Sequence, residues 1–517
     1  MPTYTNPGVY VSESAFVSRT ARSNSSRSSA VFFGEASRGP EEATLVDSWS
    51  TFKTLYGDIS PSYDLGYTVY HYFANGGRDA YIVRVPASGA TKASATVTYK
   101  PAGAGSSVTA TLFAAKAISK GTWGNSLKVN VIPSTITTAT ATQIPSFTLA
   151  VTLANSNGVD VEVERWNEVS VDPSSNRYLY TVINNYSKYI TIDAYTNSVP
   201  QPTASATFTL TSGNTALSSG SDGASAGVVA SDYTAALSKL DVIEGVLLLN
   251  AVNRTDTLTV NEFLTKAESR GNSFVIIDPV IGDGSSSSIA GVVGNYNSSN
   301  YGAVYYPALK MVDPSKTGPG AIRVTAPGGA IAGAYVRTEI ERNVAKAPAG
   351  YNVDVRGAIG LEFQFTEAQA GSLYSNNHVN MLKAVPGGGI IINGARTLDK
   401  DAPGKFIPTR RTLNYLKQVL KEATAFAVFE PNDSRLWDTL SIGVSGLLAD
   451  FWRTGGLKGA SAREAFYVIC DSSNNTATTI DNGEVHIEVG VSLQSPAEFV
   501  VINISQWTGG SNTVETL

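Results

Sequence analysis

Cysteine and histidine are nearly absent from the 517 residues, with one cysteine and three histidines. A single cysteine excludes a disulfide within the chain, so the fold does not depend on an oxidising compartment. Cys470 ends an apolar run that predicts a buried strand, and we expect a structural thiol there. His71, His378 and His486 are far apart in sequence and match no metal-ligand spacing. Neither residue type therefore indicates a metal centre or a nucleophile.

Charge is also scarce: charged residues make up 16% of the chain, against about 25% in average soluble proteins, and the net charge is −5. No basic excess is available to neutralise a nucleic-acid backbone, so we expect no nucleic-acid partner. Low charge density fits either a surface hidden in partners or a β-rich fold with neutral loops, and the sequence favours neither.

Long hydrophobic runs are missing. The longest, such as 245–249, are too short to cross a bilayer, and no basic start followed by an apolar stretch marks a signal peptide. We therefore expect a soluble protein made in the cytoplasm, with no direct membrane insertion.

Motifs for catalysis are missing too. No Gly-x-Ser-x-Gly elbow has a plausible Asp and His behind it. The glycine clusters at 327–329 and 387–389 are not followed by the Lys-Ser or Lys-Thr of a phosphate-binding loop, and tight turns are expected at both. The sequence thus predicts no enzyme and no cofactor, although a hydrolase with widely separated carboxylates leaves no local signature.

The N-terminal segment of the chain is expected to be an extended arm. Residues 1–29 predict an extended segment, because 18–29 is rich in Ser and Arg and too poor in apolar residues to build a core. Packed structure begins with an apolar strand at 30–34. The next expected elements are a helix capped by Asp47 or Ser48 and ended by Gly57, a helix over 63–75 and a strand over 81–85.

Composition changes twice further along the chain, at Pro86 and at Ser198. Between these points, 122–197 alternates apolar and polar residues, which predicts a mostly antiparallel β domain with one wet face. After Ser198, buried strands alternate with helical segments up to 278, which is typical of an α/β unit.

The last third predicts two amphipathic helices and two strands. One helix carries Leu413, Leu416, Val419 and Leu420, and the other runs from Asp433 or Ser434 to Gly455. The strands are expected at 485–489 and 499–504, and the tail from 507 is polar. Lys400-Asp401 and Arg410-Arg411 are interpreted as solvated loops.

Both chain ends combine a polar segment with a β-competent stretch. This arrangement suits strand donation between subunits, although 7–11 could equally be an edge strand of its own domain. The expected inter-subunit strand residues are Pro7, Gly8, Val9, Tyr10, Val11, Val485, Ile487, Val489, Phe499, Val501 and Ile504. The expected hinge residues are Ser18, Ser23, Ser26 and Ser29.

Short stretches in a fixed order resemble the tail sheath family of contractile phages and related injection particles. The opening 7–13 is similar to the start of that family's arm, and 121–125 resembles the signature that opens its β domain. Each stretch is short, but together they cover nearly the whole chain. The others are 164–170, 177–178, 182–184, 303–307, 346–350, 394–398 and 429–432.

The resemblance implies a multidomain α+β or α/β fold whose core domain is discontinuous and built from both chain ends. The implied parts are an N-terminal arm (1–29), an inner core domain (30–86 and 360–506), an inserted β-rich domain (87–200), an inserted α/β domain (201–359) and a C-terminal arm (507–517).

The resemblance also implies a function. The chain would be a homo-oligomer of stacked hexameric rings, helically arranged around an inner tail tube protein, with the baseplate and the tail terminator as further partners. This sheath would belong to a virion tail assembled in the host cytoplasm, and its contraction would drive the tube through a cell envelope. The competing interpretation is a static surface-layer or fibre protein.

Overall fold

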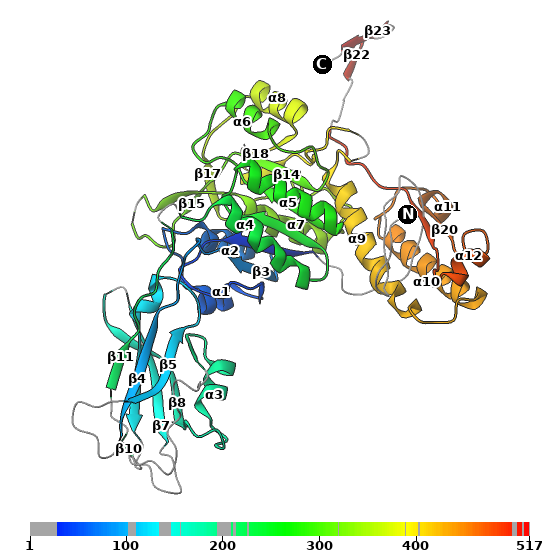
Figure 1. Cartoon of the computed structure of the whole chain (residues 1–517). Helices are drawn as coiled ribbons and strands as arrows, with labels where there is room; N and C mark the ends of the chain where they lie inside the picture. Colours follow the sequence, from blue (N-terminus) through cyan, green and yellow to red (C-terminus); the bar gives the residue numbers. More distant parts are fainter. Residues whose placement is uncertain are drawn as a thin grey trace.

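The computed structural model describes residues 28–101, 110–133, 146–155, 157–193, 208–209, 213–224, 227–318, 320–387, 389–401, 404–498, 504–508 and 511–515. Figure 1 shows a central sheet covered by helices, a β-rich part on one side and a smaller helical part on the other. The elements of the central part come from well-separated stretches of the chain, whereas those of the helical part follow one another in sequence over 407–491.

The central sheet has eight strands in the order β19-β18-β14-β13-β12-β1-β3-β2. The six inner strands are parallel, and the two edge strands, β2 and β19, run antiparallel to their neighbours. Strands buried on both faces read as continuous apolar runs, which is why 30–34 and 245–249 are recognisable in the sequence. The bounds are β1 (Ser29–Gly34), β2 (Thr44–Val46), β3 (Ala80–Arg84), β12 (Leu247–Ala251), β13 (Ser273–Ile277), β14 (Gly302–Tyr306), β18 (Val379–Val385) and β19 (Gly389–Asn393).

Helices cover both faces of this sheet. Successive strand residues point to opposite faces, so Phe32 packs with one layer of helices and Phe33 with the other. The first layer comprises α1 (Trp49–Tyr56), α2 (Asp64–Ala74) and α7 (Gly328–Glu341). The second comprises α4 (Ala230–Ala236), α5 (Thr257–Arg270), α6 (Ser286–Gly294) and α8 (Glu367–Asn377), with a 3-10 helix at Leu237–Val242.

Several helix ends lie where the sequence predicts them. The Ser48 side chain accepts a hydrogen bond from the Thr51 amide at the start of α1, and Gly57 ends that helix with φ 96°. Asp433 likewise caps α10 (Ser434–Arg453) by accepting from the amides of Arg435 and Leu436. These predictions succeed because capping depends on residues only two or three positions away.

The glycine cluster at 327–329 is not the predicted tight turn. It begins α7, which packs against α2. A Cβ atom at Gly329 would lie 2.0 Å from the carbonyl oxygen of Thr68, and one at Gly333 would lie 2.5 Å from that of Tyr72. Glycine therefore lets the two helix backbones approach closely. At the other cluster, Pro386 and Gly387 form a turn directly after β18, as predicted.

The β-rich part consists of two four-stranded antiparallel sheets, β10-β4-β5-β9 and β11-β6-β7-β8. Side chains of both sheets share one apolar core, which contains Phe113 and Phe147. The predicted antiparallel β structure is therefore confirmed. The bounds are β4 (Ser94–Pro101), β5 (Ala110–Ala117), β6 (Leu127–Pro133), β7 (Phe147–Ala154), β8 (Asp160–Val169), α3 (Leu179–Tyr186), β9 (Ile190–Ile192), β10 (Phe208–Thr209) and β11 (Gly213–Ala216).

A small three-stranded sheet lies beside the central one. It has the order β16-β15-β17, with β15 (Leu309–Val312) antiparallel to both neighbours, β16 (Ile322–Thr325) and β17 (Ala358–Leu361). Leu309 and Met311 of β15 contribute to the same apolar core as α1, α2 and α7. The small sheet is therefore packed onto the central unit.

The helical part at the C-terminal side is organised around α9 (Ile407–Thr424). Leu416 and Val419 of α9 pack with Leu447 and Leu448 of α10, as the predicted apolar faces require. The part also contains α11 (Ala462–Ala465), β20 (Phe466–Ile469), α12 (Ala477–Asp481) and β21 (Glu488–Val491). Further on, β22 (Ile504–Thr508) and β23 (Ser511–Glu515) form an antiparallel hairpin.

The opposite face of α9 docks onto the central sheet through polar side chains. Asn414 donates from Nδ2 to the Ser273 carbonyl oxygen at 2.8 Å, and Arg410 donates from Nη1 to the Tyr301 hydroxyl at 2.8 Å. Arg410 and Arg411 are buried within this face, so the prediction that they lie in a solvated loop is wrong. Their partners come from distant parts of the chain, which local sequence does not reveal.

Candidate assembly sites

The predicted arm residues fall into two groups. Pro7, Gly8, Val9, Tyr10, Val11, Ser18, Ser23, Ser26, Phe499 and Val501 lie outside the described residues. The structure does place Ser29, which begins β1 and donates from Oγ to Asp79 at 2.6 Å. It also places Ile504, which begins β22 and pairs with Glu515.

The strand predicted at 485–489 is shorter and later than expected. β21 begins at Glu488, because the Asn475 side chain bonds the backbone before it. Asn475 donates from Nδ2 to the His486 carbonyl oxygen at 2.9 Å and accepts from the His486 amide at 2.6 Å. Val485 and Ile487 then pack against the cluster of Leu436, Leu440 and Cys470.

Among the described residues, strand β21 pairs with β20 alone, with Val489 opposite Val468. The Ser492 amide donates to the Ala465 carbonyl oxygen at 2.8 Å. Hydrogen bonding alternates along an antiparallel strand, so the amides of Val489 and Val491 point away from β20. Within the described ranges, no strand pairs with that outer edge of β21. The outward main-chain groups of this edge are competent to accept a further strand.

The first described residue, Ser28, is held by a buried ion pair, which we call the N-terminal root. Glu339 of α7 accepts from the Ser28 amide at 3.1 Å and from its hydroxyl at 2.8 Å. Arg411 of α9 donates to Glu339 Oε2 at 2.6 Å and to the Ser28 hydroxyl at 3.1 Å. The Arg411 side chain is 2% exposed and that of Glu339 is 7% exposed. The root thus ties the chain before β1 to two helices.

A second buried ion pair holds Glu498, directly before residues 499–503, and we call it the C-terminal root. Arg396 donates to both carboxylate oxygens of Glu498, at 3.0 and 2.6 Å, and the Tyr374 hydroxyl also donates to this carboxylate. Burial raises the pKa of Glu498, but the bonds from Arg396 and Tyr374 outweigh it and hold the pKa below its usual range. Glu498 is therefore an anion at neutral pH.

Sequence reasoning did not identify either root. The stretch 394–398 contains Arg396, but its partner lies 102 residues away. Glu339 and Arg411 are separated by 72 residues. Arg396 and Glu498 lie among apolar or small residues, which is a weak signal of a buried partner, whereas Glu339 and Arg411 have charged neighbours and give no such signal.

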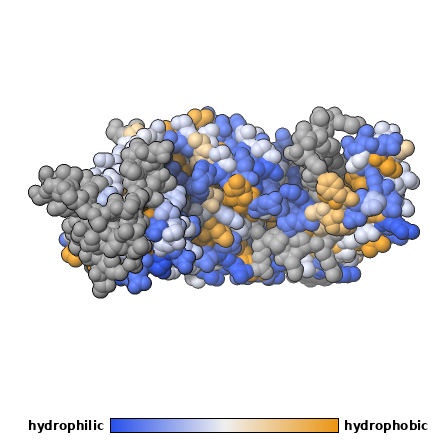
Figure 2. All heavy atoms as spheres, turned by 60° about the horizontal axis from the view of Figure 1, so that its bottom comes forward, coloured by the Kyte–Doolittle hydropathy of each residue, from blue (hydrophilic) through white to orange (hydrophobic). Residues whose placement is uncertain are grey.

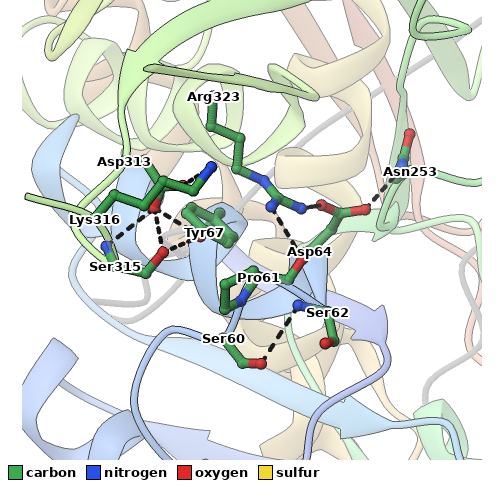
Figure 3. A network of polar contacts seen from close by, with 10 residues as sticks. All are labelled: Ser60, Pro61, Ser62, Asp64, Tyr67, Asn253, Asp313, Ser315, Lys316 and Arg323. Atoms are coloured by element: carbon green, nitrogen blue, oxygen red, sulfur yellow. Dashed lines mark hydrogen bonds and ion pairs between the residues drawn. The ribbon is translucent and has the colours of Figure 1, made fainter. Parts of the chain in front are cut away.

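A third polar network anchors the β15–β16 hairpin to the start of α2 (Figure 3). Arg323 donates to Asp64 Oδ1 at 2.7 Å and to the Pro61 carbonyl oxygen at 3.0 Å, and its guanidinium lies 4.2 Å from the centroid of the Tyr67 ring. The Tyr67 hydroxyl donates to Asp313 at 2.8 Å. Burial raises the pKa of Asp313, but hydrogen bonds from Ser315 and Tyr67 outweigh it, and the pKa falls to about 2.

Two side chains of potentially reactive type, Cys470 and His71, are buried. Burial raises the pKa of the Cys470 thiol to about 11 and lowers the pKa of His71 to about 4, so Cys470 stays protonated and His71 neutral at pH 7. Among the described residues, no group of three or more His, Cys, Asp or Glu side chains could hold a metal ion. No helix in the described part of the chain is long and apolar enough to span a membrane.

Exposed apolar side chains are spread over the surface. Phe429 is 87% exposed, Val242 82%, Tyr351 79% and Ile442 73%. Figure 2 shows small apolar patches between polar regions on one face of the molecule. Such patches are compatible with several contacts to neighbouring molecules.

Comparisons with known proteins agree with one another. Residues 399–506 match the family model of the phage tail sheath C-terminal domain. The tail sheath protein of Vibrio phage KVP40 is 26% identical over 177 residues, which are 34% of this chain and 25% of that relative. The chain therefore aligns with about a quarter of the curated relative's length.

Solved structures extend the match across the fold. The sheath complex of an extracellular contractile injection system, PVC, in its contracted state has a TM-score of 0.58 and 20% identity, covering 98% of this chain and 99% of that one. A chain of the anti-feeding prophage baseplate has a TM-score of 0.57 and 19% identity, with 98% and 100% covered. At this identity the likeness concerns the fold. The sequence matches thus place residues 399–506 in the phage tail sheath C-terminal domain family, and the chain as a whole shares the fold of sheath proteins from contractile injection systems.

Proposed function

We propose that the chain is a structural, non-enzymatic subunit of a contractile sheath. Copies of it polymerise as stacked rings around an inner tube and shorten by rigid-body rearrangement, which drives the tube through a cell envelope. The observation that carries this proposal is the agreement of fold over 98% of the chain with a contractile sheath protein. The particle is either a phage tail or an extracellular injection device, and its further partners are the tube protein, the baseplate and the tail terminator.

Electron microscopy of the purified full-length protein tests this function. Hollow striated tubes of two lengths, extended and contracted, are expected. Flat lattices would instead support a surface-layer protein, and discrete particles that never polymerise would refute the sheath.

In the proposed domain organisation, a discontinuous inner domain is built from both ends of the chain, and the outer parts are inserted between its two segments. Two features bear on where its boundaries lie. β1 pairs with β12, so segments 30–86 and 201–359 share one sheet. The helical part has its own apolar core around α9 and α10. A rigid central unit and a separate helical part suit a subunit that moves as rigid bodies.

We also propose that the terminal segments link neighbouring subunits by strand addition. The N-terminal hinge is expected over 18–29 from the sequence, and because Ser29 lies in β1 we propose 18–27 as the part that bends. The outer edge of β21 is the acceptor, because the outward amides of Val489 and Val491 offer main-chain donors to an incoming strand. The residues 7–11 and 499–504 are the candidate donors.

Replacing Val489 by proline tests the acceptor edge. Proline removes an outward amide but leaves the bonds to β20, so V489P should abolish tube formation and leave the monomer folded. V489A, which removes only side-chain packing, is the matched control and should still assemble. Sedimentation measures both, and equal assembly of V489P and V489A would exclude strand addition at β21.

A further inference from the structure

The N-terminal and C-terminal roots share the same local chemistry. In each, a buried arginine forms an ion pair with a largely buried glutamate, and the arginine guanidinium faces a tyrosine ring. Arg411 lies 4.7 Å from the centroid of Tyr335, and Arg396 lies 4.1 Å from that of Tyr374. The N-terminal ion pair holds the amide and hydroxyl of Ser28, and the C-terminal ion pair includes Glu498 itself. Each of these two residues lies next to a terminal segment that is proposed to leave the subunit. Both roots are therefore built to fix a position.

The N-terminal root reaches the central sheet through two tyrosines. Tyr335 of α7 lies under Arg411, and its hydroxyl is hydrogen-bonded to that of Tyr305 in β14. Both tyrosines are fully buried. A displacement of Arg411 would therefore shift Tyr335 first and then, through Tyr305, strand β14.

The C-terminal root reaches the same sheet through an asparagine. The Asn380 side chain in β18 accepts from the Arg396 amide at 2.8 Å and donates to the Arg396 carbonyl oxygen at 2.8 Å. Its Nδ2 also donates to the carbonyl oxygen of Val304 in β14 at 3.2 Å. Asn380 is 0% exposed, so water cannot replace these bonds.

The two connections meet on adjacent strands, because Tyr305 of β14 is the register partner of Asn380 of β18. Burial raises the pKa of Tyr305 well above its usual value, so its hydroxyl stays protonated at neutral pH. The bond from Asn380 to the Val304 carbonyl oxygen brings the C-terminal connection to the residue next to Tyr305.

We propose that two polar connections, Glu339-Arg411-Tyr335-Tyr305 and Glu498-Arg396-Asn380, couple the two roots where they meet on the adjacent strands β14 and β18 of the central sheet. Their members are positioning residues: a shift of one root is transmitted to the other, because any break leaves a buried charge or polar group unpaired. The consequence for a sheath, that the two terminal segments of a subunit move together, rests on the proposed function. The coupling itself is a property of the single subunit.

Hydrogen exchange of the full-length monomer, followed by mass spectrometry, tests the coupling. Glu498→Gln removes the charge at the C-terminal root, and exchange is measured at the N-terminal root, over residues 28–34. E498Q should speed exchange there by about threefold or more, the lower end of coupling between residues of one network. Tyr335→Phe removes only the hydroxyl that links the root to Tyr305, and in a Y335F background the effect of E498Q on residues 28–34 should disappear.

The matched control is Glu367→Gln, which breaks an exposed pair with Lys383 on the same strand, β18, and should leave residues 28–34 unchanged. If E498Q does not fold, Ser28→Ala perturbs the other root more mildly, and exchange is then measured over 394–398 with the same expectation. An effect confined to the mutated root, or one that persists with Y335F, overturns the proposal.

Electron microscopy of the same variants separates the two proposals. Coupling in the monomer without tube formation by the unaltered protein refutes the sheath function and keeps the coupling. Tubes from the unaltered protein without coupling refute the inference alone.

Discussion

The close approach of α2 and α7 makes a sharp prediction for Gly329→Ala. An added Cβ would lie 2.0 Å from the Thr68 carbonyl oxygen and 2.8 Å from the Thr68 carbonyl carbon. Ordinary contacts of carbon need about 3.5 Å, so the helices must separate by more than about 1 Å. Both obstructing atoms belong to backbone within a helix, which cannot rotate away as a flexible side chain can.

The expected cost follows from packing. Overpacking of a close-packed core costs about 1–3 kcal/mol and occasionally more, and separation of α2 from α7 also loosens the apolar layer around Tyr72 and Tyr335. Alanine recovers at most about 1 kcal/mol through its higher helix propensity. We expect G329A to destabilise the central unit by about 3 kcal/mol, near the upper end of the overpacking range.

The assay should report on the central unit alone, because a chain of several parts does not unfold in one step. Hydrogen exchange of the α2 and α7 amides meets this need, and about 3 kcal/mol corresponds to roughly a 100-fold loss of protection. Gly446→Ala in the exposed face of α10 is the matched control, since its Cβ would meet nothing within 4 Å. G446A should stabilise α10 by about 0.4–1 kcal/mol. Unchanged protection in G329A, or equal behaviour of the two variants, would refute the close-approach argument.

Four further outcomes are expected. Deleting residues 1–17 should leave a folded monomer that forms no tubes, measured by calorimetry and microscopy, and loss of the thermal transitions that the intact chain shows would contradict this. Val9→Pro should weaken assembly more than Val9→Ala in sedimentation, because proline removes a main-chain donor. The pKa of Asp313 is about 2, against an ordinary 3.8, so ionised Asp313 adds stability that is present above pH 3.8 and lost as the pH falls toward 2. Asp313→Asn should therefore remove this acid step from denaturation curves. Asp58→Asn, at a side chain 76% exposed, is the control and should keep the step. Triggered particles should contract without any nucleotide, and a requirement for ATP hydrolysis would contradict this. Lengthening 18–27 by a few residues should trap the particles in the extended state, and normal contraction with the longer linker would contradict that.

Local signals in the sequence predict most elements of the central sheet. The apolar run at 30–34, the Ser48 cap and the helix at 63–75 each depend on neighbours within a few residues, and each appears in the structure. The antiparallel alternation in the β-rich part is equally local. Where period, cap and length agree, a single sequence is informative.

Failures occur where the deciding partner is distant. The cluster at 327–329 has the glycines of a turn, but contact with Thr68 makes it the start of a buried helix. Arg410 and Arg411 have the charge that is typical of a solvated loop, but their burial is made possible by hydrogen bonds to Tyr301 and Glu339, respectively. Apolar and polar residues alternate over 485–489 as in a strand, but the Asn475 side chain is hydrogen-bonded to the His486 backbone, which would otherwise be available for strand pairing. In each case a long-range contact outweighs a local preference.

The roots illustrate why ion pairs rather than apolar contacts suit the two ends of such a chain. Hydrophobic contact is not directional, so an apolar root could slide under load at little cost. A buried bidentate pair such as Arg396 with Glu498 adds little net stability, because desolvation offsets the attraction between the charges. It does define one geometry, since any displacement leaves a charge buried without its partner. A subunit that transmits movement through its ends needs that positional certainty more than it needs additional stability.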